Sequence, residues 1–293
     1  YPVPHGSCTS RRGTTFIDEV RNSTKPSRLI PFIFSRTLSY VLVFNNGYCR
    51  LLKNGAYIYN GLSIYEFAIP YADSELPNIK TTQVGNTLYL VHPNHTPKQI
   101  KRTSDTSWTI SDLSFVYKAV TDQWYENAYI KFKIISGTTA FASGDNFTIS
   151  ATAGTLTDLA PVNTGNGTIT AISFKTGAPT ETWTITCDYV DASRQEWSVV
   201  GSTSGTLTAT WKSGNYPQTI VFHEQRLYLG GTPNEPQTIW GSAIGLYNTF
   251  TLGAKDSDAI QFTIASNQYD ELVNLSSGRY LLPLTYGGEF AMM

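Results

Sequence analysis

A strand-rich unit that occurs twice in the chain is the feature that most constrains its fold. Leu88-Tyr89-Leu90 and Leu227-Tyr228-Leu229 coincide at an offset of 139 residues, and the same offset superimposes proline, isoleucine and aromatic positions downstream. The predicted core positions are Leu88, Leu90, Pro97, Ile100 and Trp108 in the first unit, and Leu227, Leu229, Pro236, Ile239 and Tyr247 in the second. Four kinds of position matching without a gap predict that both units fold alike.

Two weaker copies of the unit lie nearer the ends of the sequence. In the first, Asn46-Gly47 separates the apolar run 40–44 from the run 48–52, a pattern that strongly favours a hairpin. In the last, 279–282 leads through Gly287-Gly288 into 289–291. Each of the four units follows a further apolar run: RLIPFIFS, NIKTTQV, PQTIVF or DELVNL. Four short antiparallel strands per unit, recurring at about 40–50 residues, are typical of β-propeller blades.

The offset of 139 exceeds one blade because a segment of different character lies between the two strong copies. Residues 125–212 are rich in Thr and Gly and contain the alternating runs FKIIS, FTISAT, ITAISF, TWTITCDYV, WSVVGS and TLTATW. In TWTITCDYV, the side chains of Trp183, Ile185, Cys187 and Tyr189 share one face, as in a half-buried strand. Six or seven such strands predict an immunoglobulin-like β-sandwich.

These patterns predict an all-β chain with very little helix, a partial β-propeller carrying an inserted Ig-like sandwich. We expect residues 1–124 to form the first blades, 125–212 the sandwich, and 213–293 the remaining blades. Three complete blades and an unfinished fourth are visible, whereas a closed propeller needs four to eight. Together with a first residue that is Tyr and not Met, this predicts part of a longer polypeptide or a fold completed by another chain.

Composition excludes several classes of protein. With 41% hydrophobic residues and a net charge of -1, the chain is not intrinsically disordered and offers no extended basic surface for nucleic acid. No apolar run is long enough to span a bilayer, and the first residues lack the pattern of a signal peptide. Cys8, Cys49 and Cys187 are odd in number and far apart, which predicts buried or half-buried thiols and neither a disulfide framework nor a zinc site.

The candidate metal ligands have simpler structural explanations. His92 and His95 lie three residues apart, but no Cys or carboxylate nearby in the sequence completes a ligand set, so we interpret both as turn residues. Asp256 and Asp258 lack the spacing of a calcium loop and favour a solvated turn that leads into a strand. We likewise predict a hairpin turn at 144–146. The sequence therefore predicts no metal and no cofactor.

Catalytic patterns are also missing. The run Ser104–Thr109 is similar to the Asp box of sialidase propellers, but it lacks the Gly and brings Asp105 too close to Trp108, so we expect it at most to brace a blade. Two carboxylates across a cleft would be needed for glycoside hydrolysis, and the sequence does not favour any pair among Asp18, Glu19, Glu66, Asp73 and Glu75. His223-Glu224 is interpreted as a structural turn. We predict that the chain is not an enzyme.

Two groups of residues remain as candidates for contacts. The N-terminal forty residues are locally basic, and their cations form either a solvated edge or an interface with other subunits: Arg11, Arg12, Arg21, Lys25 and Arg28. Trp197 and Trp211 could contact glycans if exposed, although a sandwich core normally buries its tryptophans.

Several stretches, in order, resemble a family of short-tailed phage tail proteins of the nozzle, or tail tubular B, type. They are PHGSCTSRRGTTFIDEV, RLIPFIFS, YVLVFNNGYCRLLKNG, LYLVHP with KQIKR, YPQTIVFHEQRLYLGGTPNEPQTIWGS, and DAIQFTIAS with GGEF. The family commonly has Arg-Arg-Pro-Gly-Thr, whereas here Arg12 is followed directly by Gly13-Thr14. The matches cover most of the chain outside the inserted segment.

The resemblance implies a structural protein of the virion, assembled in the host cytoplasm. Several copies, typically six, would form a ring that contacts tail adaptor and tail fibre or spike proteins. Viral DNA would pass through the ring without sequence-specific binding, which a nearly balanced charge permits. An extracellular glycan-binding or glycan-hydrolysing propeller with a sandwich module is the alternative, and a bacterial surface adhesin is a third hypothesis.

Overall fold

The computed structural model describes residues 16–127, 129–190, 195–204, 211, 214–253, 255–265 and 270–292. Its regular structure is β-strand throughout, apart from one turn of 3-10 helix at Leu76–Asn78, and the all-β prediction is confirmed. Among these residues, no helix is long and apolar enough to cross a membrane. The chain divides into two compact units: described residues up to Pro77 with Arg102–Thr109, and Asn78–Lys101 with Ile110–Met293.

The first sheet belongs to the first unit. Its strands are β1 (Arg28–Ile33), β2 (Ser39–Asn45), β3 (Tyr48–Lys53), β4 (Ala56–Tyr57) and β7 (Glu66–Ala68), with a small hairpin of β5 (Tyr59–Asn60) and β6 (Ser63–Ile64) beside them in sequence. Asn46 and Gly47 have φ values of 52° and 76°, which suit a two-residue turn between twisted strands. The hairpin predicted at Asn46-Gly47 is therefore confirmed.

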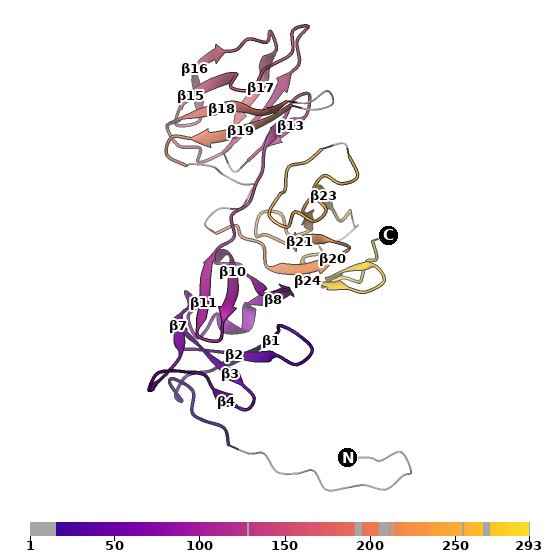
Figure 1. The fold of residues 1–293 in the computed structure, drawn as a ribbon. Coiled ribbons are helices and arrows are strands. Elements are labelled where there is room, and N and C mark those ends of the chain that lie inside the picture. The colour runs from indigo at the N-terminus through magenta and orange to yellow at the C-terminus, as the bar shows by residue number, and fades with distance from the viewer. Residues whose placement is uncertain are drawn as a thin grey trace. The chain divides into compact units, whose positions relative to one another are not determined.

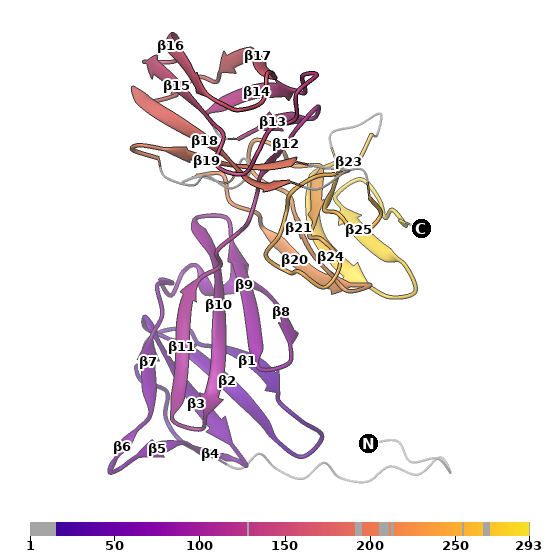
Figure 2. The same ribbon diagram turned by 45° about the horizontal axis from the view of Figure 1, so that its top comes forward.

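The second sheet is a four-stranded antiparallel meander (Figure 2). It contains β8 (Lys80–Val84), β9 (Thr87–His92), β10 (His95–Ser104) and β11 (Ser107–Asp112) in the order β11-β10-β9-β8. Leu88 and Leu90 of β9 are 2% and 0% exposed, and Ile100 lies opposite Leu88 in the pairing of β9 with β10. The alternation of apolar and polar residues along these strands places one face in a core.

The third sheet repeats this arrangement, and the fourth sheet follows it directly. β20 (Thr219–His223), β21 (Arg226–Gly230), β22 (Thr238–Gly241) and β23 (Ile260–Thr263) pair in sequence order, and β24 (Leu272–Ser277) pairs with β25 (Leu281–Thr285). Glu224 and Gln225 have positive φ values in the β20–β21 turn, as the structural interpretation of His223-Glu224 required. The amide nitrogens of Phe290 and Met292 donate to carbonyls of β25, so 289–292 extends this sheet.

The offset of 139 between the two strong copies of the repeat holds along their second strands, β9 and β21, but not beyond them. Leu227 and Leu229 are fully buried, like their counterparts in β9. Leu90, however, lies opposite Lys98, whereas Leu229 lies opposite Trp240. Among the other predicted positions, Pro97, Ile100, Trp108 and Ile239 are buried, and Pro236 and Tyr247 are half-buried.

Trp108 and Tyr247 therefore do not occupy equivalent places, contrary to the prediction from the offset. Trp108 lies in β11, the fourth strand of its sheet, whereas Tyr247 lies in the connection between β22 and β23. The difference arises because β10 and β11 are joined by a two-residue turn, while residues 242–259 separate β22 from β23. A constant offset persists only as long as the connections have equal length.

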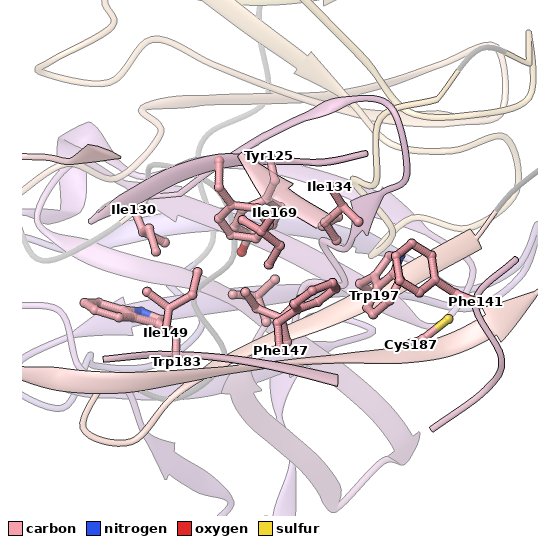
Figure 3. Close-up of a cluster of buried hydrophobic side chains, with 14 of the residues drawn as sticks. Tyr125, Ile130, Ile134, Phe141, Phe147, Ile149, Ile169, Trp183, Cys187 and Trp197 are labelled. Atoms are coloured by element: carbon pink, nitrogen blue, oxygen red, sulfur yellow. The ribbon is translucent and has the colours of Figure 1, made fainter. Parts of the chain in front are cut away.

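The segment between the two strong copies is a sandwich of two antiparallel sheets (Figure 1). Its strands are β12 (Ala119–Val120), β13 (Trp124–Glu126), β14 (Ile130–Ile135), β15 (Asn146–Thr152), β16 (Thr155–Val162), β17 (Thr168–Phe174), β18 (Glu181–Val190) and β19 (Gln195–Gly201). One sheet has the order β12-β19-β18-β15-β16 and the other β13-β14-β17. Phe132, Ile149, Trp183 and Trp197 are among the side chains that fill the core between them (Figure 3).

Strand β18 shows how far the alternation predicted from the sequence extends. Trp183, Ile185 and Cys187 are buried, as predicted, but Tyr189 is 48% exposed. The pairing of β18 with β19 shifts register between Cys187 and Tyr189, and such a bulge turns the following side chain away from its former face. The exposure of Tyr189 is thus a consequence of the bulge.

The limits of the sandwich differ from residues 125 and 212. Ala119 pairs with Trp197, so the strand pairing begins earlier. Trp211 is buried in another core, with Phe115, Trp240 and Phe250 as neighbours. Its ring centroid lies 4.6 Å from that of Phe115, so the chain leaves for the sandwich and returns from it at one aromatic cluster. The run TLTATW lies outside the described residues up to its last residue, Trp211.

The first strands of successive sheets lie next to one another in the second unit. β20 contacts both β8 and β24, although the sandwich separates β8 from β20 in the sequence. Tyr89 packs edge-on against Phe222 with ring centroids 5.2 Å apart, which fastens β9 to β20. Leu272 and Leu275 of β24 pack in one cluster with Tyr228 and Ile239. Side chains, and not shared strand ladders, therefore join these sheets.

Candidate functional site

The described cations of the N-terminal segment are used within their own unit. Arg21 forms an ion pair with Glu66, and its guanidinium lies 3.2 Å from the ring centroid of Tyr48. Lys25 lies 3.8 Å from Asp73.

Arg28 donates to the carbonyl oxygens of Leu76 and Pro77, and burial lowers its pKa. Asn45 holds the segment before it, because its amide donates to backbone oxygens of residues 22, 25 and 26. Arg11 and Arg12 lie outside the described residues, and an interface at these cations stays a prediction.

Asp105 and Trp108, the pair that resembles an Asp box, brace the first unit. The Asp105 carboxylate accepts hydrogen bonds from Tyr40, Lys53 and Arg102, with the Lys53 nitrogen at 2.6 Å. Donation by Lys53 and Tyr40 lowers the pKa of Asp105 to about 2. The Trp108 indole nitrogen donates to the Asp105 carbonyl at 3.1 Å, and its ring packs edge-on against Tyr40. The turn is thus fixed by its carboxylate, its backbone and its tryptophan together.

Arg226 has a similar role in the third sheet and was not singled out by the sequence. It is 7% exposed, and its guanidinium donates to the carbonyl oxygens of Ser242, Asp256 and Asp258. These acceptors belong to the long connection between β22 and β23, which Arg226 therefore fixes to the start of β21. The positive charge is solvated by backbone dipoles, so its removal would leave buried carbonyls without a donor.

The other polar residues considered from the sequence mostly fix turns. Asp258 accepts from the Lys255 amide, which confirms a turn in the DSDAIQF segment, but at 8% exposed it is buried and not solvated as predicted. The rings of His92 and His95 lie 5.2 Å apart, and His92 Nδ1 accepts from the Asn94 amide.

The hairpin turn predicted at 144–146 is wrong, because β14 and β15 on either side of it belong to different sheets, and Asp145 lies in the connection between them. Its carboxylate is 4% exposed and accepts from the backbone amides of Ala142, Thr164 and Gly165.

The carboxylates considered for glycoside hydrolysis, among which the sequence favoured no pair, also form local hydrogen bonds or ion pairs. Asp18 accepts from the Glu19 amide, Asp73 from the Asn46 amide, and Glu75 from the Ala72 amide. Glu66 bonds with Arg21 and Arg50. These contacts stabilise local structure.

A shallow hollow of about 310 Å³ lies beside the long connection of the third sheet. Tyr89, Gln99, Leu113 and Ser114 line it together with residues 245–248. Burial raises the pKa of the Tyr89 hydroxyl, and nearby Tyr247 adds to this effect. Two phenol groups, those of Tyr89 and Tyr247, are therefore among the polar groups that line the hollow.

The exposed tryptophan is not one of those considered from the sequence. Trp124 of β13 is 54% exposed, whereas the two tryptophans considered as glycan contacts, Trp197 and Trp211, are 0% and 6% exposed. Trp197 fills the sandwich core and donates to Thr121 Oγ1 at 2.9 Å. In DQWYEN, Trp124 and Tyr125 adjoin each other on opposite faces of a strand, and only the strand's register shows which of the two is outside.

Comparison of the chain with protein-family models and with curated proteins finds no match.

Proposed function

We propose that the chain is a structural, non-enzymatic component of a short phage tail, in which several copies form the nozzle ring. In this proposal the four successive sheets are blades of a β-propeller, and the two-layered segment is an Ig-like sandwich inserted between blades. The ordered resemblance to the nozzle family suggested this role, and the structural features below support it.

The observation that carries the proposal is the contact of β20 with both β8 and β24. In a propeller the first strand of each blade lies nearest the axis, so first strands of successive blades are neighbours. This neighbourhood persists between β8 and β20 although the whole sandwich intervenes in the sequence. Each sheet is also a meander of hydrogen-bonded neighbours, as a blade is.

Both ends of the inserted sandwich are fixed to the surrounding sheets. The chain leaves and re-enters the sheets through Phe115 and Trp211, which pack on Phe250 and Trp240. A parallel bridge between Val116 and Thr249, and a hydrogen bond from the Lys118 amide to Thr251, fix the outgoing segment further. Both ends of the insertion are therefore packed in a core, whereas domain boundaries usually fall in exposed, flexible linkers.

The balance of charged residues supports a channel-forming structural protein and does not favour tight binding of nucleic acid. Lys and Arg number 21 against 22 Asp and Glu, and most cations described above are paired within their own unit. A protein that neutralises many phosphates binds DNA tightly and in a salt-dependent way. A channel that releases DNA should avoid such affinity.

The test is to purify virions of the phage that encodes this chain and to detect the protein by mass spectrometry and by antibody labelling in electron microscopy. We expect it in the tail, in several copies around the axis, and size-exclusion chromatography with light scattering should show a multimer of the full-length protein. Its absence from virions would refute the assignment. A monomer that cleaves a glycan, with activity lost on changing one carboxylate, would favour the enzymatic alternative.

A further inference from the structure

The outward face of the small sandwich sheet, β13-β14-β17, carries the one exposed tryptophan of the protein. All six tryptophans lie in described segments, and apart from Trp124 at 54% they are between 0% and 6% exposed. An indole ring is a large apolar surface, which a folded protein normally buries. Trp124 is therefore the one indole of the chain that a molecule in solution can reach, and its neighbours decide what it can bind.

Strand register defines what surrounds Trp124. Trp124 lies opposite Lys133, and Lys133 lies opposite Thr170. The next outward row consists of Glu126, Lys131 and Ser173. Directly opposite side chains have Cβ atoms about 4.5–5.5 Å apart, so the members of each row are neighbours. The pairing of β14 with β17 shifts register between the two rows, between Lys131 and Lys133. We call these six residues the Trp124 platform.

The platform carries more positive than negative charge. Glu126 pairs with Lys131 at 3.0 Å and with Lys175 at 2.7 Å. Burial alone would raise the pKa of Glu126, but the hydrogen bonds from Lys175 and Lys131 outweigh this effect and lower it. Lys175 lies outside the six platform residues, and within the platform two ammonium groups, those of Lys131 and Lys133, stand against one carboxylate. Asp122, at the edge of this region, is held by the amide and hydroxyl of Ser136.

Lys131 links the charge to the aromatic ring. Its ammonium nitrogen lies 5.2 Å from the ring centroid of Trp124, within the range of a cation–π contact. A ligand resting against the indole would therefore have a cation beside it. The remaining outward groups, Thr170 and Ser173, are hydroxyls that can donate and accept hydrogen bonds.

We propose that the Trp124 platform binds an acidic polysaccharide. The apolar face of a sugar ring would rest on the indole, and its carboxylate or sulfate would lie against the ammonium groups of Lys131 and Lys133. The composition of the platform favours a glycan over a protein partner, because Lys, Glu and Ser are depleted at protein–protein interfaces. Here the tryptophan is surrounded by lysines and hydroxyls. The inference does not depend on the proposed tail function.

Fluorescence quenching of the full chain tests this proposal with high selectivity. Iodide reaches exposed indoles, so in the free protein it should quench Trp124 and spare the five buried tryptophans. The probes are polygalacturonate, hyaluronate, alginate and colominic acid, with neutral dextran and poly-L-glutamate as controls. We expect at least one acidic polysaccharide to protect Trp124 from iodide, and high salt to weaken the protection.

Variants separate the platform from general charge effects. Trp124→Ala should abolish binding measured by calorimetry, and Lys131→Gln or Lys133→Gln should weaken it about tenfold. Lys101→Gln removes one charge from an exposed position of β10, and Tyr286→Ala removes an aromatic ring that is 81% exposed; both should bind like the wild type. Unchanged thermal denaturation of the variants verifies their folding, as expected for exposed side chains.

Four results would overturn the proposal. Failure of all four acidic polysaccharides to bind, or binding that survives Trp124→Ala, would overturn the proposal. Equal binding of poly-L-glutamate would also overturn it, because charge alone would then suffice. Binding of neutral dextran at the same affinity would show that the lysines have no part in it and would refute the acidic class.

Discussion

The carboxylate of Asp145 should be a main determinant of the stability of the sandwich. It is 4% exposed and accepts backbone hydrogen bonds from Ala142 at 2.9 Å, Thr164 at 2.8 Å and Gly165 at 3.2 Å. The Thr164 hydroxyl donates to it as well. These bonds join the segment before β15 to the segment before β17, which are distant in sequence. One side chain therefore closes two loops at once.

The magnitude follows from the donors that a substitution would leave without a partner. A buried unsatisfied donor costs about 1–3 kcal/mol, so Asp145→Ala, which orphans three amides, should destabilise the protein by about 3 kcal/mol at the lower limit. Asp145→Asn retains one acceptor oxygen but turns an NH2 group toward the amides, and we expect a loss of about 2 kcal/mol. The matched control is Asp158→Asn on β16, whose side chain is exposed and should change stability by less than about 0.5 kcal/mol.

Urea denaturation of the full chain gives the free energies, and hydrogen exchange measured by mass spectrometry locates the effect. Residues 142–145 and 163–166 should exchange faster in the Asp145 variants, while β20 to β25 should be unchanged. Equal stability of the Asp145 and Asp158 variants would refute the reasoning.

The same carboxylate should give a pH dependence of defined sign. Burial alone would raise the pKa of Asp145, but the amide hydrogen bonds outweigh this and lower it below the ordinary value. A carboxyl group with a lowered pKa in the folded state adds stability above its unfolded pKa, near 4, and loses it as the pH falls through the folded value. The difference between wild type and Asp145→Ala should therefore shrink in acid. A constant difference from neutral pH to acid would contradict this origin of the stability.

Three further predictions concern other parts of the chain. Because the pKa of Asp105 is about 2, its contribution should be full above pH 4 and disappear as the pH falls toward 2; with its side chain 40% exposed, that contribution is about 1 kcal/mol, measurable as the difference from Asp105→Asn in urea titrations. Arg226→Met should destabilise by about 3 kcal/mol and Arg226→Lys by less, since lysine retains a donor; equal losses in thermal denaturation would show that the hydrogen bonds to the long connection do not matter. Burial raises the pKa of the Cys187 thiol to about 11, with the charges of Asp145 and Asp188 adding to it, so iodoacetamide should label Cys187 only after unfolding, and rapid labelling of the native protein would show that β18 opens.

Local patterns in the sequence were sufficient to predict turns and those strands that have one buried and one exposed face. Asn46-Gly47 was predicted as a turn because only a few residue types adopt positive φ at both positions. The buried face of most of β18 followed from alternation, and the buried leucines of β9 and β21 followed from the repeat. The strand β16 was not predicted, because every residue of TLTDLAPV except Leu159 is exposed and Pro161 interrupts the pattern. An edge strand that faces solvent on both sides has no periodicity to detect.

Features that depend on distant parts of the chain could not be predicted. The register of β10 relative to β9 includes a bulge between His95 and Lys98, which the offset of 139 does not encode. Trp211 was assigned to the sandwich by its position in the sequence, yet it packs with Phe115 and Trp240. The exposure of Trp124 depends on which side of β13 meets the core, and adjacent aromatic residues leave that choice open. Tertiary packing decided each of these cases.

The aromatic cluster where the chain leaves and re-enters the sheets makes the sandwich an exchangeable module. Phe115 and Trp211 touch across the two crossing points, so a short loop could bridge them without pulling β8 away from β20. Evolution can replace everything between those two rings, by another sandwich or by nothing, while the surrounding sheets keep their packing. A chain built in this way can change what it presents to the outside faster than it changes its own architecture.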